Sequence, residues 1–215
     1  MAVPLDAIMA FHNAFRNDLK GIDAAALESA RGKAGLAPTI ERFRFFNEML
    51  VWHAHGEEQA VFTRLETVAP LVAEAYLKDH HGLDAAYDTL NAAYAAHDPL
   101  QTARATAVFK FHLDIHLGKE DAHLYRLMRE RVSLPDQAKA VGIIASTSPQ
   151  DRLPDVIQWL YPLLGNDDRE KATRLLQTML PPPAFAPVMQ LVQKTIGNDW
   201  SELTRRIPSL AEITE

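Results

Sequence analysis

The chain has 215 residues, of which 47% are hydrophobic and 23% are charged, a composition typical of one soluble globular domain or of one domain with an extension. No segment approaches the ~20 consecutive apolar residues of a membrane span, and the absence of cysteine excludes disulfides, iron–sulfur clusters and thiol catalysis. The formal net charge of -6 gives no basic surface for nucleic acid, and the start of the chain lacks the pattern of a secretion signal, so we expect a cytoplasmic protein that binds neither nucleic acid nor membrane.

The first 131 residues predict four long helices. Alanine-rich segments with an apolar period of about 3.6 residues are separated by a loop at 31–37, by Pro70 and by the run His97-Asp98-Pro99. Asp98 is a suitable N-cap and Pro99 a suitable first helical residue. We therefore expect an all-α fold, an up-down-up-down four-helix bundle, with helices over about 4–30, 38–69, 71–97 and 99–131.

The remainder of the chain is richer in proline and predicts shorter helices. Nine of the 13 prolines lie at position 135 or later, and the run Pro181-Pro182-Pro183 must interrupt any helix. Shorter helices are expected over roughly 136–146, 151–161, 167–179, 185–196 and 199–207. The sequence thus predicts two parts, a bundle over 1–131 and a helical extension over 132–215, and the extension could cap a pocket or form a homodimer surface.

Nine histidines occur in the chain, and none lies after residue 123. Residues four apart share one face of a helix, and on this basis each of the four apolar stripes carries a histidine near its centre. Two of these histidines are followed one turn later by a glutamate, in His53-x-x-x-Glu57 and His116-x-x-x-Glu120. The candidate metal ligands are therefore His12, His53, Glu57, His80, His116 and Glu120.

A single histidine on an apolar face is more often a core residue with a hydrogen-bond partner than a ligand. Four imidazoles and two carboxylates on facing helices would, however, be costly to bury without compensation, and a bound cation removes that cost. A structural zinc site needs only four ligands, so six indicate two metals joined by a carboxylate. Such a histidine-rich set in a bundle core suits iron or manganese better than magnesium or calcium, and zinc is a further alternative.

The remaining polar candidates stay open. His55 lies about 160° from His53 around the helix and is expected at the surface, and His81 is less well placed than His80. His112 and His123 share the stripe of His116 and could line the pocket, hold waters beyond the ligands, or pack in the core or at its boundary. Asp84 lies one turn after His80 and could be a seventh ligand or act beyond the ligands. His97 is expected to be a charge partner at a helix end.

The segments 53–62 and 116–125 resemble the second- and fourth-helix motifs of hemerythrin-like (HHE cation-binding) domains. His12 followed by Phe15 matches the first helix of that family, and Asp79-His80 matches the third, so the resemblance covers about residues 4–131. It implies a non-haem di-iron centre held by the six candidate ligands. The oxygen-carrying members have two histidines one turn apart in the third helix, whereas this chain has Asp84 at the second position, which favours a more open coordination sphere.

The resemblance implies a module that binds or senses a small ligand such as dioxygen or nitric oxide. One alternative is a di-iron enzyme that acts on nitric oxide or peroxide, or in iron handling and repair, with a proton donor among Tyr76, Tyr87 and His112. The repair-type relatives tend to carry a cysteine-bearing segment, which this chain lacks. Another alternative is a metal-free helical scaffold that acts through protein contacts.

Overall fold

The computed structural model describes residues 4–147 and 150–213, and in these ranges all regular structure is helical, which confirms the predicted all-α fold. The chain divides into two compact units. One consists of Phe15–Ser133, and the other combines Met1–Ala14 with Leu134–Glu215. None of the helices in the described ranges is both long and apolar enough to cross a membrane.

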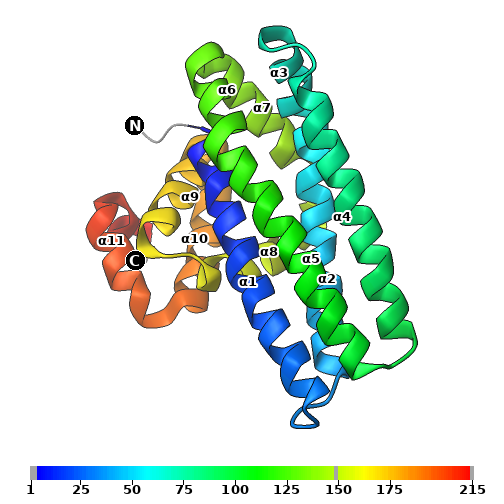
Figure 1. Cartoon of the computed structure of the whole chain (residues 1–215). Helices are drawn as coiled ribbons and strands as arrows, with labels where there is room; N and C mark the ends of the chain where they lie inside the picture. Colours follow the sequence, from blue (N-terminus) through cyan, green and yellow to red (C-terminus); the bar gives the residue numbers. More distant parts are fainter. Residues whose placement is uncertain (1–3, 148–149, 214–215) are drawn as a thin grey trace. The chain divides into compact units, whose positions relative to one another are not determined.

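The unit Phe15–Ser133 contains long helices that match the predicted ones (Figure 1). Two of them contain a π-helical segment that the sequence does not predict, at Glu57–Phe62 and Glu120–Leu124. The elements in chain order are α1 (Asp6–Ala30), which begins in the other unit, α2 (Ala37–Gly56), η1 (Glu57–Phe62), α3 (Thr63–Val68), α4 (Val72–Ala95), α5 (Pro99–Lys119), η2 (Glu120–Leu124) and α6 (Tyr125–Arg131).

The helix boundaries follow the breaks in the sequence. The side chain of Asp98 accepts hydrogen bonds from the backbone N–H groups of Leu100 and Gln101, both at 3.0 Å, and Pro99 opens α5. These contacts confirm the predicted N-cap, because they satisfy amides that the first turn leaves without helical partners. After α1, the backbone of Gly32 adopts a φ of 70°, a conformation that glycine accepts at low cost.

Aromatic side chains fill the core between α1, α2, α4 and α5. Phe15 of α1 packs edge-on against Phe46 of α2, with ring centres 5.6 Å apart. Phe43 of α2 lies 5.2–6.2 Å from four further rings, those of Phe46, Tyr87, Tyr94 and Phe109. Rings of this size bury much apolar area, so the cluster fixes the helices that carry the candidate ligands.

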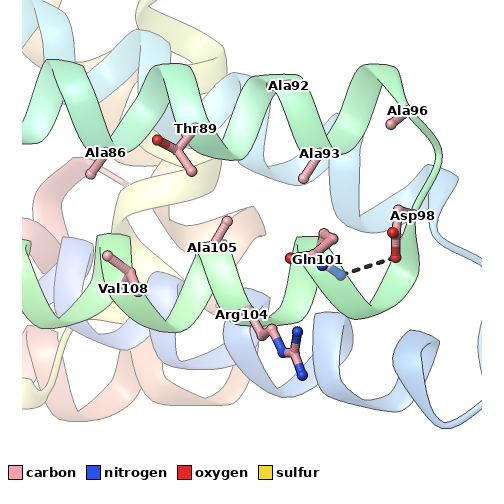
Figure 2. A pocket seen from close by; sticks show the side chains of 10 residues that line it. All are labelled: Ala86, Thr89, Ala92, Ala93, Ala96, Asp98, Gln101, Arg104, Ala105 and Val108. Carbon is pink, nitrogen blue, oxygen red and sulfur yellow. Dashed lines mark hydrogen bonds between the residues drawn. The ribbon is translucent and has the colours of Figure 1, made fainter.

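A cavity of about 430 Å³ lies between α4 and α5, which run side by side (Figures 1 and 2). Half of its ten lining residues are alanines, and its polar lining residues are Thr89, Asp98, Gln101 and Arg104. No histidine lines it within the described part of the chain, so it is separate from the candidate metal centre.

The second unit has its own apolar core. Ala10 and Ala14 of α1 belong to this core, together with side chains from the C-terminal helices such as Tyr161, Phe185 and Met189. A buried arginine, Arg169, donates to the carbonyl oxygen of Tyr161 at 2.9 Å and reinforces the core. The elements are α7 (Leu134–Thr147), η3 (Gln150–Arg152), α8 (Leu153–Leu163), α9 (Asn166–Met179), α10 (Pro182–Ile196), η4 (Gly197–Asp199), α11 (Trp200–Arg206) and η5 (Pro208–Ile213).

The expected domain division at 131/132 remains a prediction. In the structure, the change from one compact unit to the other falls between Ser133 and Leu134, and the first residues of α1 are grouped with the C-terminal helices. The proline run acts as expected, since α9 ends at Met179 and α10 starts at Pro182.

Candidate metal centre

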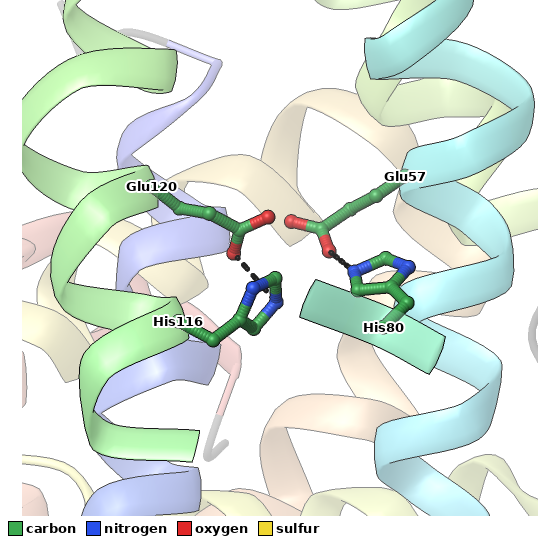
Figure 3. A group of neighbouring side chains, drawn as sticks. All are labelled: Glu57, His80, His116 and Glu120. Carbon is green, nitrogen blue, oxygen red and sulfur yellow. Dashed lines mark ion pairs between the residues drawn. The ribbon is translucent and has the colours of Figure 1, made fainter. Parts of the chain in front are cut away.

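Four of the candidate ligands meet in the core of the unit Phe15–Ser133. Glu57, His80, His116 and Glu120 each offer one nitrogen or oxygen atom, and these atoms all lie within 4.8 Å of one another (Figure 3). All four residues are buried, and both glutamates are fully inaccessible to solvent. They come from three parts of the chain that are far apart in sequence, which is the arrangement that a metal-binding bundle core requires.

Glu57 lies between two histidines from different helices. Its Oε1 is 3.3 Å from Nε2 of His53, and its Oε2 is 3.9 Å from Nε2 of His80. Glu120 forms a similar pair within its own helix, with Oε2 at 3.4 Å from Nε2 of His116. Two ligand atoms that bind the same metal ion at ~2.1 Å lie about 3.0–3.4 Å from each other. The separations within the His53–Glu57 and His116–Glu120 pairs are therefore suited to a shared cation.

The electrostatics of the cluster also favour a cation. Burial, followed by the charge of Glu57, raises the pKa of Glu120 well above its ordinary value of 4.5. Arg16, which pairs with Asp121 at 2.7 Å, opposes this shift but is outweighed. Two carboxylates placed together away from water repel each other, and a divalent cation between them would remove that repulsion.

Both glutamates stand where an α-helix changes to a π-helix. Glu57 is the first residue of η1, and Glu120 is the first residue of η2. In a π-helix the hydrogen bond joins residues five apart, and such wide turns are often found at functional sites. In η2 the backbone N–H of Tyr125 donates to the carbonyl oxygen of Glu120 in this way.

Carboxylates also lie near the ring nitrogens that face away from the cluster. Nδ1 of His80 lies 2.6 Å from Oε1 of Glu58, whereas Nδ1 of His116 lies 3.8 Å from Oδ2 of Asp79, which is beyond hydrogen-bond distance; Asp79 forms an ion pair with Lys119. A carboxylate hydrogen-bonded to Nδ1, as Glu58 is to His80, favours the tautomer that presents Nε2 to a metal. We did not expect these roles from the sequence, although Glu58 follows Glu57 directly and Asp79 precedes His80.

A buried tyrosine also contacts Glu57. The hydroxyl of Tyr125 donates a hydrogen bond to Oε1 of Glu57, and the side chain of Tyr125 is fully buried. Burial and the charge of Glu57 raise the pKa of Tyr125 well above 10.0, so the hydroxyl keeps its proton. Of the tyrosines proposed from the sequence, Tyr76 donates instead to the carbonyl oxygen of Lys119 at 3.4 Å, and Tyr87 lies on a cavity wall.

A cavity of about 320 Å³ reaches the cluster. His53, Glu57, His80 and His116 form part of its wall, and the more exposed side chains of His55 and Asp84 also line it. A small molecule in this cavity would therefore contact the candidate ligands. Asp84 faces the same cavity as His80 but is not part of the buried cluster.

The remaining histidines have different surroundings. His55, His81, His112 and His123 are exposed. His12 is fully buried on α1, in the portion of this helix that belongs to the other unit. It precedes Phe15 by three residues and so lies on the same face of α1, and the ring of Phe15 has its centre 5.3 Å from that of His53.

The donor set fits a transition-metal cation. Imidazole nitrogens and carboxylate oxygens in a bundle core are ligands for iron, manganese or zinc. Nε2 of His80 is buried and, within the described residues, makes no hydrogen bond, which is costly for an imidazole unless a metal takes the place of the partner.

The fold and the site define a helical protein with a buried cluster of histidines and carboxylates that could hold a metal cation. Comparison with known families agrees, because residues 3–108 match the family described as the Hemerythrin HHE cation binding domain. This part of the chain therefore belongs to the hemerythrin HHE family and is a cation-binding domain. The matched segment ends before His116 and Glu120.

Similar proteins extend the likeness beyond the matched domain. Zinc finger protein BRUTUS of Arabidopsis thaliana is 25% identical over 185 residues, which is 83% of this chain and 15% of that protein. Two BRUTUS-like zinc finger proteins of the same plant are 22% and 23% identical over 188 and 199 residues, covering 83% and 80% of this chain and 15% and 16% of their own length. The chain thus spans about one sixth of the length of these relatives. No solved structure matches.

Proposed function

We propose that the chain is a non-haem di-iron protein that binds or senses a small ligand such as dioxygen or nitric oxide. The observation that carries this proposal is the position of Glu57, whose two oxygens face histidines on two different helices, Oε1 toward His53 and Oε2 toward His80. A carboxylate in this position can bridge two metals, whereas an imidazole binds only one. The HHE family match supports the cation and leaves its identity and number to be measured.

The proposed ligands divide into two groups around Glu57. His80, His116 and Glu120 lie on one side of it, in the buried cluster of four. His53 lies on the other side. His12 is retained as a further proposed ligand on the sequence pattern alone. Iron fits this mixed set of imidazole and carboxylate ligands, and manganese or zinc are alternatives.

The cavity supports the binding of an external ligand. Ferrous iron with imidazole ligands and an open coordination position binds dioxygen and nitric oxide. The cavity of about 320 Å³ would admit such molecules to the candidate ligands, and the buried surroundings would limit their exchange with water. We also retain two predictions from the sequence, a cytoplasmic location and a homodimer formed through the C-terminal helices.

The test is metal analysis combined with an optical spectrum of the protein purified under air. We expect two iron ions per chain and near-ultraviolet charge-transfer bands, and we expect azide or nitric oxide to change these bands. One metal per chain, or zinc in iron-replete cells, would contradict the di-iron proposal. A two-iron protein that does not respond to azide or nitric oxide would contradict ligand binding only.

The cavity also allows a second candidate, a di-iron enzyme that acts on nitric oxide or peroxide, because a substrate in it would meet the candidate ligands that line its wall. Peroxide or nitric oxide turnover by the iron-loaded protein, lost when the metal is removed, would support this candidate. Ligand binding without turnover would support the sensor.

A further inference from the structure

Tyr125 touches the carboxylate on which the two-metal proposal depends. Its hydroxyl donates to Oε1 of Glu57, the oxygen that also faces His53, while Oε2 of Glu57 faces His80. Tyr125 is fully buried, and it is contributed by α6, whereas Glu57 is the first residue of η1. The contact therefore connects the two helical segments that carry the His53-x-x-x-Glu57 and His116-x-x-x-Glu120 motifs.

The π-helical segment explains how Tyr125 reaches this position. In a regular α-helix, a residue five positions after Glu120 would point about 140° away from it. In η2 the backbone N–H of Tyr125 instead donates to the carbonyl oxygen of Glu120, so that residues five apart come into line. The wide turn thus places the phenol on the side of the helix that holds the ligands.

The corresponding position in the first motif has a similar placement. Phe62 is five residues after Glu57 and ends the π-helical segment η1. Its ring centre lies 5.2 Å from that of His80. Each wide turn therefore places an aromatic side chain against a candidate ligand, but only Tyr125 of the two has a hydroxyl that can hold a carboxylate.

We propose that Tyr125 is a positioning residue of the metal centre, an inference that rests on the proposed two-metal function. Its hydrogen bond fixes the carboxylate plane of Glu57 so that one oxygen faces His53 and the other faces His80. A glutamate side chain rotates about several bonds, and a single orientation has to be enforced by its neighbours. Without the hydroxyl, Glu57 samples orientations in which it no longer joins the two groups of ligands.

The experiment compares Tyr125→Phe with a matched control, Tyr161→Phe. Tyr161 is also fully buried and its hydroxyl forms a 3.0 Å hydrogen bond with Thr173, within the core of the other unit. Both substitutions remove one buried hydroxyl and keep the ring. A loss caused only by a missing buried hydrogen bond would therefore appear in both variants.

Full-length native protein and both variants are stripped of metal and titrated with Co²⁺, whose visible absorption reports the geometry of its ligands. We expect Tyr125→Phe to bind Co²⁺ about ten-fold more weakly than the native protein and to show shifted visible bands, since loss of a partner of a metal ligand typically has an effect of this size. Tyr161→Phe is expected to match the native protein in both affinity and spectrum. If Tyr125→Phe does not fold, Tyr125→Met provides the second variant without a hydroxyl.

The outcomes separate the two proposals. Native affinity and native bands in Tyr125→Phe would overturn the positioning role of Tyr125 and leave the metal centre intact. Equal weakening in Tyr125→Phe and Tyr161→Phe would also overturn it, because the effect would then be one of general stability. A native protein that binds no Co²⁺, or only one ion per chain, would overturn the two-metal function itself.

Discussion

The rings of His80 and His116 meet edge to face, with their centres 4.8 Å apart, although one lies on α4 and the other on α5. Each ring has a carboxylate near Nδ1, Glu58 in one case and Asp79 in the other, and each Nε2 lies near a buried glutamate. Two adjacent imidazoles would repel each other if both were protonated. The pair is instead suited to two neutral rings that share their surroundings with a metal cation.

The predicted ligands His53 and His116 can be tested against His55, which lies on the same helix as His53. We expect His53→Ala and His116→Ala to lose bound metal, because both rings are buried beside a glutamate of the cluster. His55→Ala is the control, since His55 is exposed and its ring nitrogen contacts Gln59 at 2.6 Å. Inductively coupled plasma analysis measures the metal content of each variant. Equal loss of metal in all three variants would show that burial does not distinguish the ligands His53 and His116 from His55.

The two buried glutamates can be tested by removing their charge alone. We expect Glu57→Gln or Glu120→Gln to hold fewer than two metals per chain while the helical content stays unchanged, because glutamine keeps the size of the side chain but not the charge that offsets the cations. Glu74→Gln changes an exposed glutamate that pairs with Lys78 at 3.0 Å and serves as the control. Full two-metal loading in both cluster variants would exclude a carboxylate-bridged centre.

The metal-free protein should lose stability as the pH rises. Burial and the charge of Glu57 hold the pKa of folded Glu120 above its ordinary 4.5, so the folded state binds this proton more tightly than the unfolded state does. The free energy of unfolding therefore falls by up to about 1.4 kcal/mol per pH unit as the pH rises from ~4.5 toward the folded pKa.

Urea unfolding of chelator-treated protein between about pH 5 and pH 8 measures this effect. We expect Glu120→Gln to weaken the pH dependence and to be more stable than the native chain in the metal-free state at neutral pH. A metal-free native protein whose stability does not change over this range would show that Glu120 is not held protonated by its surroundings.

The C-terminal helices should be needed to keep the protein soluble. Ala10 and Ala14 of α1 share a core with Tyr161, Phe185 and Met189, so a chain cut after residue 133 leaves an apolar face of α1 without its partners. We expect such a fragment to be less soluble than the full chain and to bind a dye specific for exposed apolar surface. A fragment that stays monomeric, soluble and metal-loaded would show that the C-terminal part is dispensable for the site.

The sequence predicted the elements well because strong local signals mark them. The cap at Asp98, the breaks at Pro70 and at 31–37, and the proline run at 181–183 all act within a few residues. The paired motifs could also be predicted from the sequence, because a histidine and a glutamate four residues apart share one face of a helix whatever residues follow them.

The sequence reasoning missed Tyr125 because the helical period changes at η2. Counting in steps of 100° places Tyr125 away from Glu120, and no local feature of the sequence signals the wide turn that brings them together. The grouping of the start of α1 with residues after 133 was likewise not predicted, because it depends on contacts between segments more than 100 residues apart.

The two wide turns have a consequence for how the molecule could take up a cation. A π-helical turn interrupts the regular hydrogen-bond pattern of the α-helix, so we expect the backbone to deform more easily at Glu57 and Glu120 than in the flanking helices. Small backbone adjustments at these points alone would move the carboxylates, while the aromatic core around Phe43 remains fixed. Amide hydrogens of Glu57–Phe62 and Glu120–Leu124 should therefore exchange with solvent faster than those of the flanking helices, and cation binding should slow them.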